Sequence, residues 1–244
     1  MAETIVWISG ATEGVGSGLA KTVPWPDARV ITLNRRVHPD FDTVQFDLTK
    51  PETYAAVEES FRRELKDFKG ERAVFFHNAF YPGPANYGFV SEIDQADYAR
   101  CIQANAAAPL ILGDMFLRAV GSDYEVGLIL MSSASARHPF VGSASYNAAK
   151  AGVEMWVRTV KRELAERGRD NIWVTAVRPG FVESESTRLG AQMDEHDYPT
   201  GPLLKRQLAS REHLFTPEEA GRNIWGELPP KNNESVLLFG EMVK

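Results

Sequence analysis

The sequence predicts an α/β fold with a doubly wound, mainly parallel sheet and helices on both faces. Short apolar runs typical of buried strands alternate along the chain with longer segments of helical period. A glycine-rich turn directly follows the first of these runs. No low-complexity linker interrupts the alternation, so residues 1–244 are expected to form a single domain.

The expected strands are short and rich in β-branched and aromatic residues, which suit a pleated, buried surface. They cover residues 5–9, 29–33, 73–76, 126–131, 172–177 and 236–239. Helical segments separate most of them, which is the pattern of right-handed βαβ crossovers in a parallel sheet. We therefore expect the carboxyl ends of the strands to meet at one edge, where ligands bind in such sheets.

The expected helices fill the intervals between the strands. They cover residues 14–22, 51–68, 94–120 and 143–166, and another begins at residue 216. Asp94 is well placed to cap the third of these helices. The stretch Thr216-Pro217-Glu218-Glu219 is a strong helix start, because proline suits the first turn and acids suit the positive end of the helix dipole.

The interval 181–214 does not continue this alternation. It carries Gly, Pro, Met, His and Tyr without a clear hydrophobic period. A loop of this length in a compact domain is typically a functional lid or a partly disordered segment. We expect a substrate lid there.

Composition excludes several classes of protein. Hydrophobic residues make up 43% and charged residues 25%, which suits a globular core, and a net charge of −6 without a basic block argues against nucleic acid as a partner. The single cysteine, Cys101, cannot form an internal disulfide and is expected to be a small apolar residue in a helix. No apolar run could cross a bilayer, no secretory signal begins the chain, and no ligand spacing indicates a metal. We expect a cytoplasmic protein without membrane partners.

The turn after the first strand has the features of a phosphate-binding loop. It runs Ser9-Gly10-Ala11-Thr12-Glu13-Gly14-Val15-Gly16, with glycines in a G-x-x-x-G-x-G spacing. Glycine lets the backbone turn tightly and lets a pyrophosphate approach the free N–H groups of the following helix. The alternative is a tight turn without a ligand. Its position between strand and helix favours a dinucleotide site contributed by Gly10, Thr12, Glu13, Gly14, Val15 and Gly16.

The end of the second strand bears on which dinucleotide is bound. An acid here would hold the ribose hydroxyls of NAD, whereas an arginine can hold the extra phosphate of NADP. The chain has Asn34-Arg35-Arg36, which favours NADP(H). Glu13 in the glycine turn has the opposite effect, because its charge would repel that phosphate. NAD(H) therefore remains the alternative cofactor, and surface charge remains the alternative role of the arginines.

Tyr146 and Lys150 form a candidate catalytic pair. Their i, i+4 spacing puts both on one face of a predicted helix. A free tyrosine has a pKa of about 10, and a nearby ammonium together with an oxidised nicotinamide would lower that pKa into a useful range. Ser133, thirteen residues upstream and just past a strand, can hydrogen-bond a substrate carbonyl.

Together these motifs resemble the short-chain dehydrogenase/reductase family, whose fold is a Rossmann fold. The resemblance spans Gly10 to Ser184, about three quarters of the chain. It implies that Ser133, Tyr146 and Lys150 are catalytic and that Asn105 holds a water in the proton relay to Lys150. It also implies further cofactor contacts at Asp47 and Leu48 beside the adenine, Asn78 and Ala79 after the third strand, Pro179, Gly180 and Val182 beside the nicotinamide, and Ser184 at its carboxamide.

The chain departs from the family pattern in three places. Phe80 stands where the family has the glycine of its N-N-A-G motif, and His77 replaces the first asparagine of that motif. The frequent glycine-rich tail is missing after Gly240. These departures count against the best-known subgroups, such as acyl-carrier-protein reductases.

The family resemblance also implies a homodimer or homotetramer built through the long helices. The expected helix 143–166 carries a broad apolar set that would suit such an interface, although all of it could instead be core. This set is Val153, Met155, Trp156, Val157 and Val160.

The resemblance implies an oxidoreductase that transfers a hydride between a nicotinamide and a small carbonyl or alcohol substrate. Aromatic and Met side chains near the site favour an apolar or aromatic ketone or diketone. One alternative is a catalytically silent NAD(P)-binding regulatory or scaffold protein. Another is a lyase or epimerase that holds its cofactor permanently. The residues expected to border the substrate are Phe80, Tyr81, His138, Phe140, Phe181, Met193, His196 and Tyr198.

Overall fold

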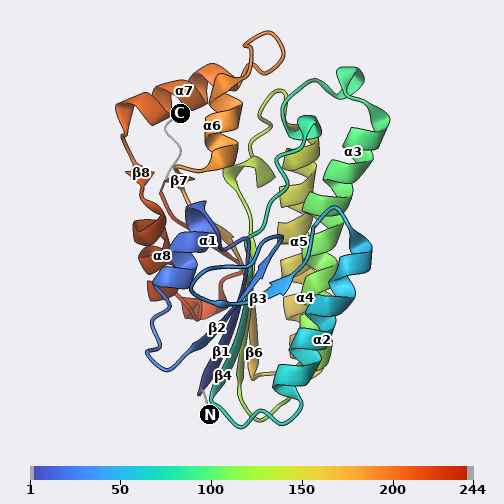
Figure 1. Cartoon of the computed structure of the whole chain (residues 1–244), viewed down its shortest axis with the longest axis vertical. Coiled ribbons are helices and arrows are strands. Elements are labelled where there is room, and N and C mark those ends of the chain that lie inside the picture. The colour runs from blue at the N-terminus through green and yellow to red at the C-terminus, as the bar shows by residue number, and fades with distance from the viewer. Residues whose placement is uncertain (1–2, 241–244) are drawn as a thin grey trace.

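A seven-stranded parallel sheet forms the centre of the molecule (Figure 1). The computed structural model describes residues 3–240; residues 1–2 and 241–244 of the predicted domain lie outside the described residues. The strand order is β3-β2-β1-β4-β5-β6-β9. The strands are β1 (Thr4–Ser9), β2 (Arg29–Asn34), β3 (Asp42–Gln45), β4 (Arg72–His77), β5 (Glu125–Met131), β6 (Ile172–Arg178) and β9 (Val236–Leu238).

The strand order confirms the predicted doubly wound sheet. The chain builds outward from β1 to β3 and then starts again on the other side of β1 with β4. Ser9, at the end of β1, aligns with Leu33 of β2 and His77 of β4, so the ends of these strands lie at one level. The reversal between β1 and β4 creates the crevice in which open α/β sheets bind ligands.

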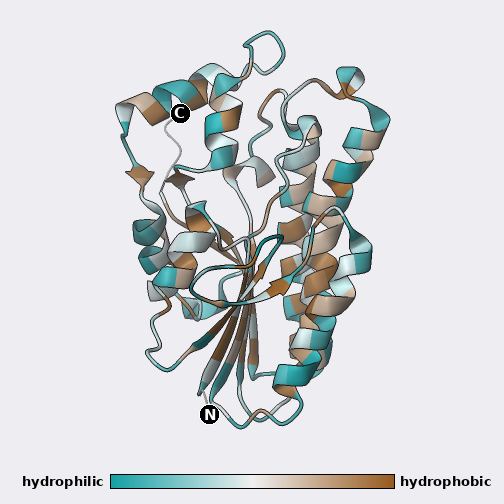
Figure 2. Cartoon of the chain, in the orientation of Figure 1, coloured by the Kyte–Doolittle hydropathy of each residue, from teal (hydrophilic) through white to brown (hydrophobic). Residues whose placement is uncertain are grey.

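Helices cover both faces of the sheet (Figure 1). One face carries α1 (Gly14–Lys21) and α8 (Pro217–Gly226), which cross closely at Gly18 and Gly221. The other face carries α2 (Tyr54–Leu65), α4 (Ala108–Ala119) and α5 (Ala144–Glu166). Hydropathy colouring shows apolar strands between helices whose polar residues face outward (Figure 2). The helix start predicted at Thr216 is confirmed at the start of α8, where Thr216 and Glu219 form a capping box.

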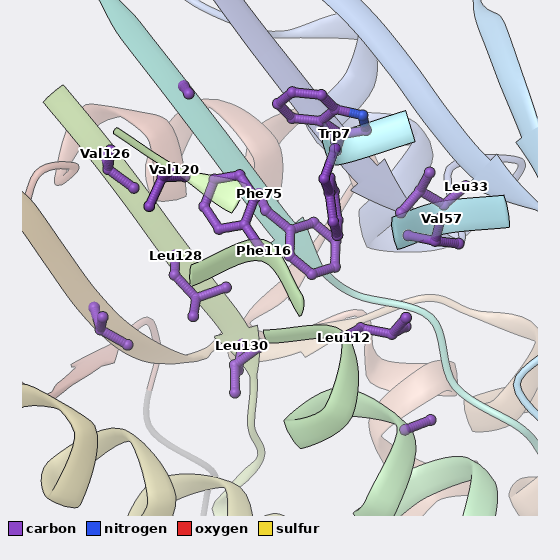
Figure 3. Close-up of a cluster of buried hydrophobic side chains, with 14 of the residues drawn as sticks. Trp7, Leu33, Val57, Phe75, Leu112, Phe116, Val120, Val126, Leu128 and Leu130 are labelled. Carbon is purple, nitrogen blue, oxygen red and sulfur yellow. The ribbon is translucent and has the colours of Figure 1, made fainter. Parts of the chain in front are cut away.

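Aromatic rings fill the core beneath α2 and α4 (Figure 3). Trp7 of β1 meets Phe61 of α2 edge to face, with ring centroids 5.3 Å apart, and Phe116 of α4 packs against both. The Trp7 indole donates a hydrogen bond to the buried Ser60 hydroxyl at 3.1 Å, so its polar atom is satisfied. This packing fixes β1 and therefore the position of the glycine turn at its end.

The long helix expected over residues 94–120 is interrupted, so the prediction of one continuous helix is wrong. It consists of α3 (Gln95–Ile102), a π-helical turn over Gln103–Ala107, and α4. Pro109 has no N–H and cannot donate to the carbonyl four residues earlier, at Asn105. Asp94 caps α3 as predicted, accepting hydrogen bonds from the backbone of Ala96 and Asp97, and Cys101 is buried within α3.

The expected loop over residues 181–214 is also wrong in structure. It contains α6 (Glu185–Gln192) and α7 (Gly201–Ser210), and its ends, β7 (Phe181–Val182) and β8 (Leu214–Phe215), pair in parallel. Ser184 caps α6 by accepting from the Thr187 N–H, and a proline lies in the first turn of α7. Both helices lie beyond the carboxyl ends of the strands, at the top of Figure 1.

No helix among residues 3–240 is both long enough and apolar enough to cross a membrane. No group of three or more His, Cys, Asp or Glu side chains in the same range is arranged to hold a metal ion.

Candidate active site

A cavity of about 1390 Å³ opens at the carboxyl edge of the sheet. Its wall is made by the glycine turn, the ends of β2, β4, β5 and β6, the first turns of α5, and the segment 181–204. The volume is larger than most small-ligand sites, which span about 300–1,000 Å³, and therefore has room for a dinucleotide and a second molecule.

Most of the residues predicted from sequence to form the site lie on this one wall. They are Gly10, Thr12, Glu13, Gly14, Val15, Asn34, Arg35, Arg36, Asp47, Leu48, Asn78, Ala79, Ser133, Tyr146, Lys150, Pro179, Gly180, Val182 and Ser184. Gly16 and Asn105 are the exceptions, because neither lines the cavity.

Gly16 acts through close packing beneath the turn. A Cβ at this position would lie 2.0 Å from the Gly10 carbonyl oxygen and 2.5 Å from the Asn78 amide nitrogen. Gly10 and Gly14 have positive φ angles of +68° and +54°, which favour glycine. The Glu13 side chain makes no capping hydrogen bond, so the first-turn N–H groups of α1 are available to an anion.

Asn34 offers a second donor to a ligand in the cavity. The side chain is 4% exposed, and its Oδ1 accepts a hydrogen bond from the Ala11 N–H at 2.8 Å. Its Nδ2 is buried and has no hydrogen-bond partner among the residues that the structure describes. Arg35 and Arg36 follow at the exposed rim. A buried amide donor beside two guanidinium groups suits a phosphorylated ribose.

Glu13 is embedded in a group of charges at the cavity mouth. Burial raises the pKa of Glu13, and a hydrogen bond and charge repulsion with Glu185 of α6 raise it further. Arg188 of α6 and Arg36 lower the same pKa. The two arginines therefore partly offset the repulsion that Glu13 was expected to exert on an extra cofactor phosphate.

Tyr146 and Lys150 lie one turn apart in α5 and face the cavity. The Lys150 ammonium is 5.5 Å from the Tyr146 ring centroid. It donates a hydrogen bond to the Met131 carbonyl at 2.8 Å and is 4% exposed. Burial lowers the pKa of Lys150 to about 8.

Burial is the main influence on the phenol pKa of Tyr146. Burial raises the pKa of its phenol, and a hydrogen bond with the Ser133 hydroxyl only partly opposes that rise. The predicted lowering requires an oxidised nicotinamide beside the Lys150 ammonium and stays a prediction; in this structure the ammonium donates to the Met131 carbonyl. The protonated phenol is therefore stable at neutral pH, which suits a proton donor.

A buried carboxylate joins the strand ends that flank this pair. Glu154 of α5 is 2% exposed and accepts from the Ser132 hydroxyl at 2.8 Å and from the Arg178 guanidinium at 2.6 and 2.9 Å. Burial alone would raise the pKa of Glu154, but the hydrogen bonds from Arg178 and Ser132 hold it below its ordinary value. The network thereby fixes the residues beside Ser133 and Pro179.

Asn105 lies behind the loop that follows β4. Its side-chain oxygen accepts from the Tyr81 N–H at 2.9 Å, and its amide nitrogen donates to the Tyr81 carbonyl at 2.9 Å. The side chain of Asn105 thus anchors the loop. In a regular α-helix the backbone carbonyl of Asn105 would accept from the N–H of residue 109, but Pro109 has no N–H to donate.

His77 replaces a family asparagine and is fully enclosed. The Ser9 hydroxyl accepts from the N–H groups of Asn78 and Ala79 at 2.9 Å each, so its own proton is directed to His77 Nδ1 at 3.0 Å. This assigns the remaining ring proton to Nε2, which is buried without a hydrogen-bond partner among residues 3–240. Burial, with a smaller effect from Lys150, lowers the pKa of His77 to about 3.

This low pKa predicts acid sensitivity of the fold. Between the ordinary His value of about 6.5 and about 3, the unfolded chain binds a proton that the folded chain does not, so stability falls as pH falls. His77 should account for roughly 2 kcal/mol of stability lost between about pH 7 and about pH 5. Urea unfolding of wild type and His77→Asn at both pH values measures this slope. Equal slopes for the two proteins would contradict the assignment.

The substrate end of the cavity is largely aromatic. Of the residues expected to border it, Phe80, Tyr81, His138, Phe140, Phe181 and Tyr198 line the cavity. Met193 and His196 do not, and His196 is exposed, because the turn between α6 and α7 carries both away from the opening.

Among the lining residues that sequence reasoning missed are Tyr87, Leu203 and Leu204. The two leucines follow Gly201-Pro202 at the start of α7, a helix start that could have been recognised. Tyr87 carries no comparable signal in the sequence.

The sequence matches proteins of known family. The family model for short chain dehydrogenases matches residues 4–195. The chain is 26% identical over 194 residues to the 3-oxoacyl-acyl-carrier-protein reductase of Escherichia coli, covering 75% of each protein. It is 24% identical over 234 residues to the benzil reductase ((S)-benzoin forming) of Bacillus cereus, covering 90% of this chain and 91% of that protein.

Solved structures share the fold. The ligand-free aldohexose dehydrogenase of Thermoplasma acidophilum superposes with a TM-score of 0.77 at 18% identity, covering 97% of this chain and 92% of that one. An actinorhodin polyketide ketoreductase variant solved with NADPH gives a TM-score of 0.75 at 19% identity, covering 97% and 95%.

Proposed function

The chain belongs to the short-chain dehydrogenase/reductase family and is an NAD(P)-dependent oxidoreductase; we propose that it uses NADP(H) to interconvert an apolar or aromatic ketone or diketone and its alcohol. One observation carries the proposal. Ser133, Tyr146 and Lys150 share a wall of a cavity whose substrate end is aromatic. Residues 1–244 would act as one catalytic domain, with residues 181–214 as its substrate lid.

The residues present fit a nicotinamide dinucleotide. The first-turn N–H groups of α1, with Gly10, Thr12, Gly14 and Val15 around them, would hold its pyrophosphate. The unpartnered Asn34 amide and the arginines at the rim would hold the phosphorylated ribose, with Asp47 and Leu48 beside the adenine. Asn78, Ala79, Pro179, Gly180, Val182 and Ser184 would border the nicotinamide end.

The preference for NADP(H) predicts a selective effect of Arg35→Ala. Losing a charge-assisted hydrogen bond of about 1.5–3 kcal/mol should weaken NADPH binding by about 10- to 100-fold. NADH affinity should change by less than about threefold, because NADH lacks the phosphate. Fluorescence titrations with both nucleotides measure this. Arg118→Ala, an exposed arginine of α4, controls for net charge, and equal losses for NADPH and NADH would refute the role of Arg35.

The chain's own groups then orient and protonate the substrate. The cofactor, when bound, supplies or accepts the hydride. The Ser133 hydroxyl would hold the substrate oxygen, and the Tyr146 phenol would donate its proton to that oxygen during reduction. Lys150 would stabilise the phenolate left behind. The carbonyl of Asn105, which lacks the helical donor at Pro109, would hold a water through which the phenol regains its proton.

The aromatic lining supports the proposed substrate class. Phe80, Phe140, Phe181 and Tyr198 line the same cavity as Tyr146, and flat rings pack well against aryl groups. The relative named as a benzil reductase acts on a diaryl diketone, and the match with it covers 90% of this chain.

A paired substrate panel tests this class. Each aryl ketone or diketone is compared with an alkyl analogue of equal length, at saturating NADPH. We expect kcat/KM to favour the aryl member by about tenfold or more, from roughly 1.5 kcal/mol of ring packing. An alkyl preference would reject the substrate class, and NADPH binding without turnover of any substrate would favour a silent binding protein.

Assembly and location also remain proposals. Ile111 of α4 and Met155 of α5 are large apolar residues exposed on the long helices. We expect a homodimer or homotetramer built through these helices, which light scattering of the purified protein tests by mass. A cytoplasmic location stays a prediction from the sequence.

A further inference from the structure

The Phe80 side chain contacts the candidate catalytic pair. Its ring meets the Tyr146 ring edge to face, with centroids 5.1 Å apart and an interplanar angle of 73°. The Lys150 ammonium lies 5.8 Å from the Phe80 ring centroid, within the range of cation–π attraction. The family has glycine at this position, so the ring is a feature of this chain.

The backbone on both sides of Phe80 is anchored by buried side chains. The Ala79 N–H donates to the Ser9 hydroxyl at 2.9 Å, and the Tyr81 N–H donates to the Asn105 side chain at 2.9 Å. Ser9 and Asn105 are 0% and 3% exposed. Because the backbone is fixed immediately before and after Phe80, the Phe80 ring stays packed against Tyr146.

We propose that Phe80 is a positioning residue, whose ring holds the Tyr146 phenol in place and keeps water away from the Lys150 ammonium. The inference rests on the proposed reductase activity. Edge-to-face packing favours one orientation of the phenol, and misorientation of a proton donor is costly to rate. The ring also covers Lys150, whose desolvation is what lowers its pKa.

The other titratable groups around Lys150 should not obscure a change in the pKa of Lys150. Tyr146 faces it from the same helix, with Tyr198 of the lid beyond, and His77 faces it from the end of β4. His77 stays neutral at neutral and alkaline pH, because burial lowers its pKa to about 3. Burial raises the pKa of both tyrosines. A change in hydration on losing the Phe80 ring should therefore appear in the titration of Lys150 itself.

Three substitutions separate the functions of the ring. Phe80→Gly restores the family residue and removes the ring, Phe80→Leu keeps apolar bulk without a ring, and Phe80→Tyr keeps the ring. Phe89→Leu, outside the cavity, is the matched control. For each variant, kcat and the KM of NADPH are measured. The pKa of Lys150 is read by NMR of carbon-labelled lysine, with its signal assigned from Lys150→Met.

We expect Phe80→Gly to lower kcat by about tenfold, with less than about threefold change in the KM of NADPH. The pKa of Lys150 should rise by about one unit or more toward its ordinary value, because water reaches the ammonium. Phe80→Leu should lower kcat several-fold with a smaller pKa change. Phe80→Tyr should keep the wild-type pKa of Lys150 and lose less kcat than Phe80→Leu.

Several outcomes would overturn the inference. Wild-type kcat in Phe80→Gly would do so, and so would a Lys150 titration unchanged in that variant. If Phe80→Gly does not fold, equal kcat in Phe80→Leu and Phe80→Tyr would overturn it. Absence of turnover by the wild-type protein would instead reject the proposed function, so the two failures are distinguishable.

Discussion

Replacing Tyr146 with phenylalanine is expected to lower kcat for carbonyl reduction by about 10³-fold while NADPH affinity stays within about twofold. The change removes only the phenol oxygen, which is the group placed to donate a proton beside Ser133. The ring that packs against Phe80 is retained. Because the missing interaction acts only in the transition state, kcat and kcat/KM should fall together.

The control for this substitution is Tyr98→Phe, which removes the same oxygen from a tyrosine of α3 outside the cavity. Its kcat should match that of the wild-type protein. A Tyr146→Phe enzyme that retains more than about a tenth of wild-type kcat would show that another group donates the proton.

The largest effect on stability is expected from Glu154→Ala, which should reduce the free energy of unfolding by about 3–5 kcal/mol. Removing this carboxylate leaves the Arg178 guanidinium, 13% exposed, without its ion-pair partner, and leaves the Ser132 hydroxyl without its acceptor. Urea unfolding at neutral pH measures the loss. NADPH affinity should fall as well, because Arg178 precedes the Pro179-Gly180 turn.

Glu163→Ala provides the comparison, since Glu163 is an exposed carboxylate on the same helix. It should change the free energy of unfolding by less than about 0.5 kcal/mol. A cost below about 1 kcal/mol for Glu154→Ala would mean that the buried network contributes little to holding the strand ends.

Features written in short stretches of sequence were predictable. The glycine turn needs a few consecutive residues, and Tyr146 with Lys150 needs one helical turn, so their placement on a common cavity wall followed from the strand–helix order. The doubly wound parallel sheet and the helices on both of its faces (Figure 1) also agree with the prediction. Local periodicity and turn chemistry suffice for such features.

Features that depend on contacts between distant residues were not predictable. The edge strand β3 is a short polar segment, Asp42-Thr43-Val44-Gln45, that becomes a strand by pairing with β2. The two helices of the segment 181–214 have weak periods and were expected to be loop. Met193 and His196 were wrongly expected to border the site for the same reason. A segment expected to be loop does not indicate which way the turn between α6 and α7 points.

The departures at His77 and Phe80 were visible in the sequence, but their consequences were not. The partner of His77 is Ser9, 68 residues away, and Phe80 reaches Tyr146 from a different strand end. Only the folded chain brings these pairs together. A departure from a family pattern therefore marks where to look, and the packing around it indicates what it does.

The most direct test of the reductase assignment is a turnover assay of the purified wild-type protein with NADPH and an aryl-substituted vicinal diketone. The absorbance of the reduced nicotinamide and the alcohol product are followed in the same sample. The account predicts steady consumption of NADPH with one alcohol formed for each NADPH oxidised. Tight binding of NADPH without alcohol formation from any ketone or diketone of the panel would contradict it.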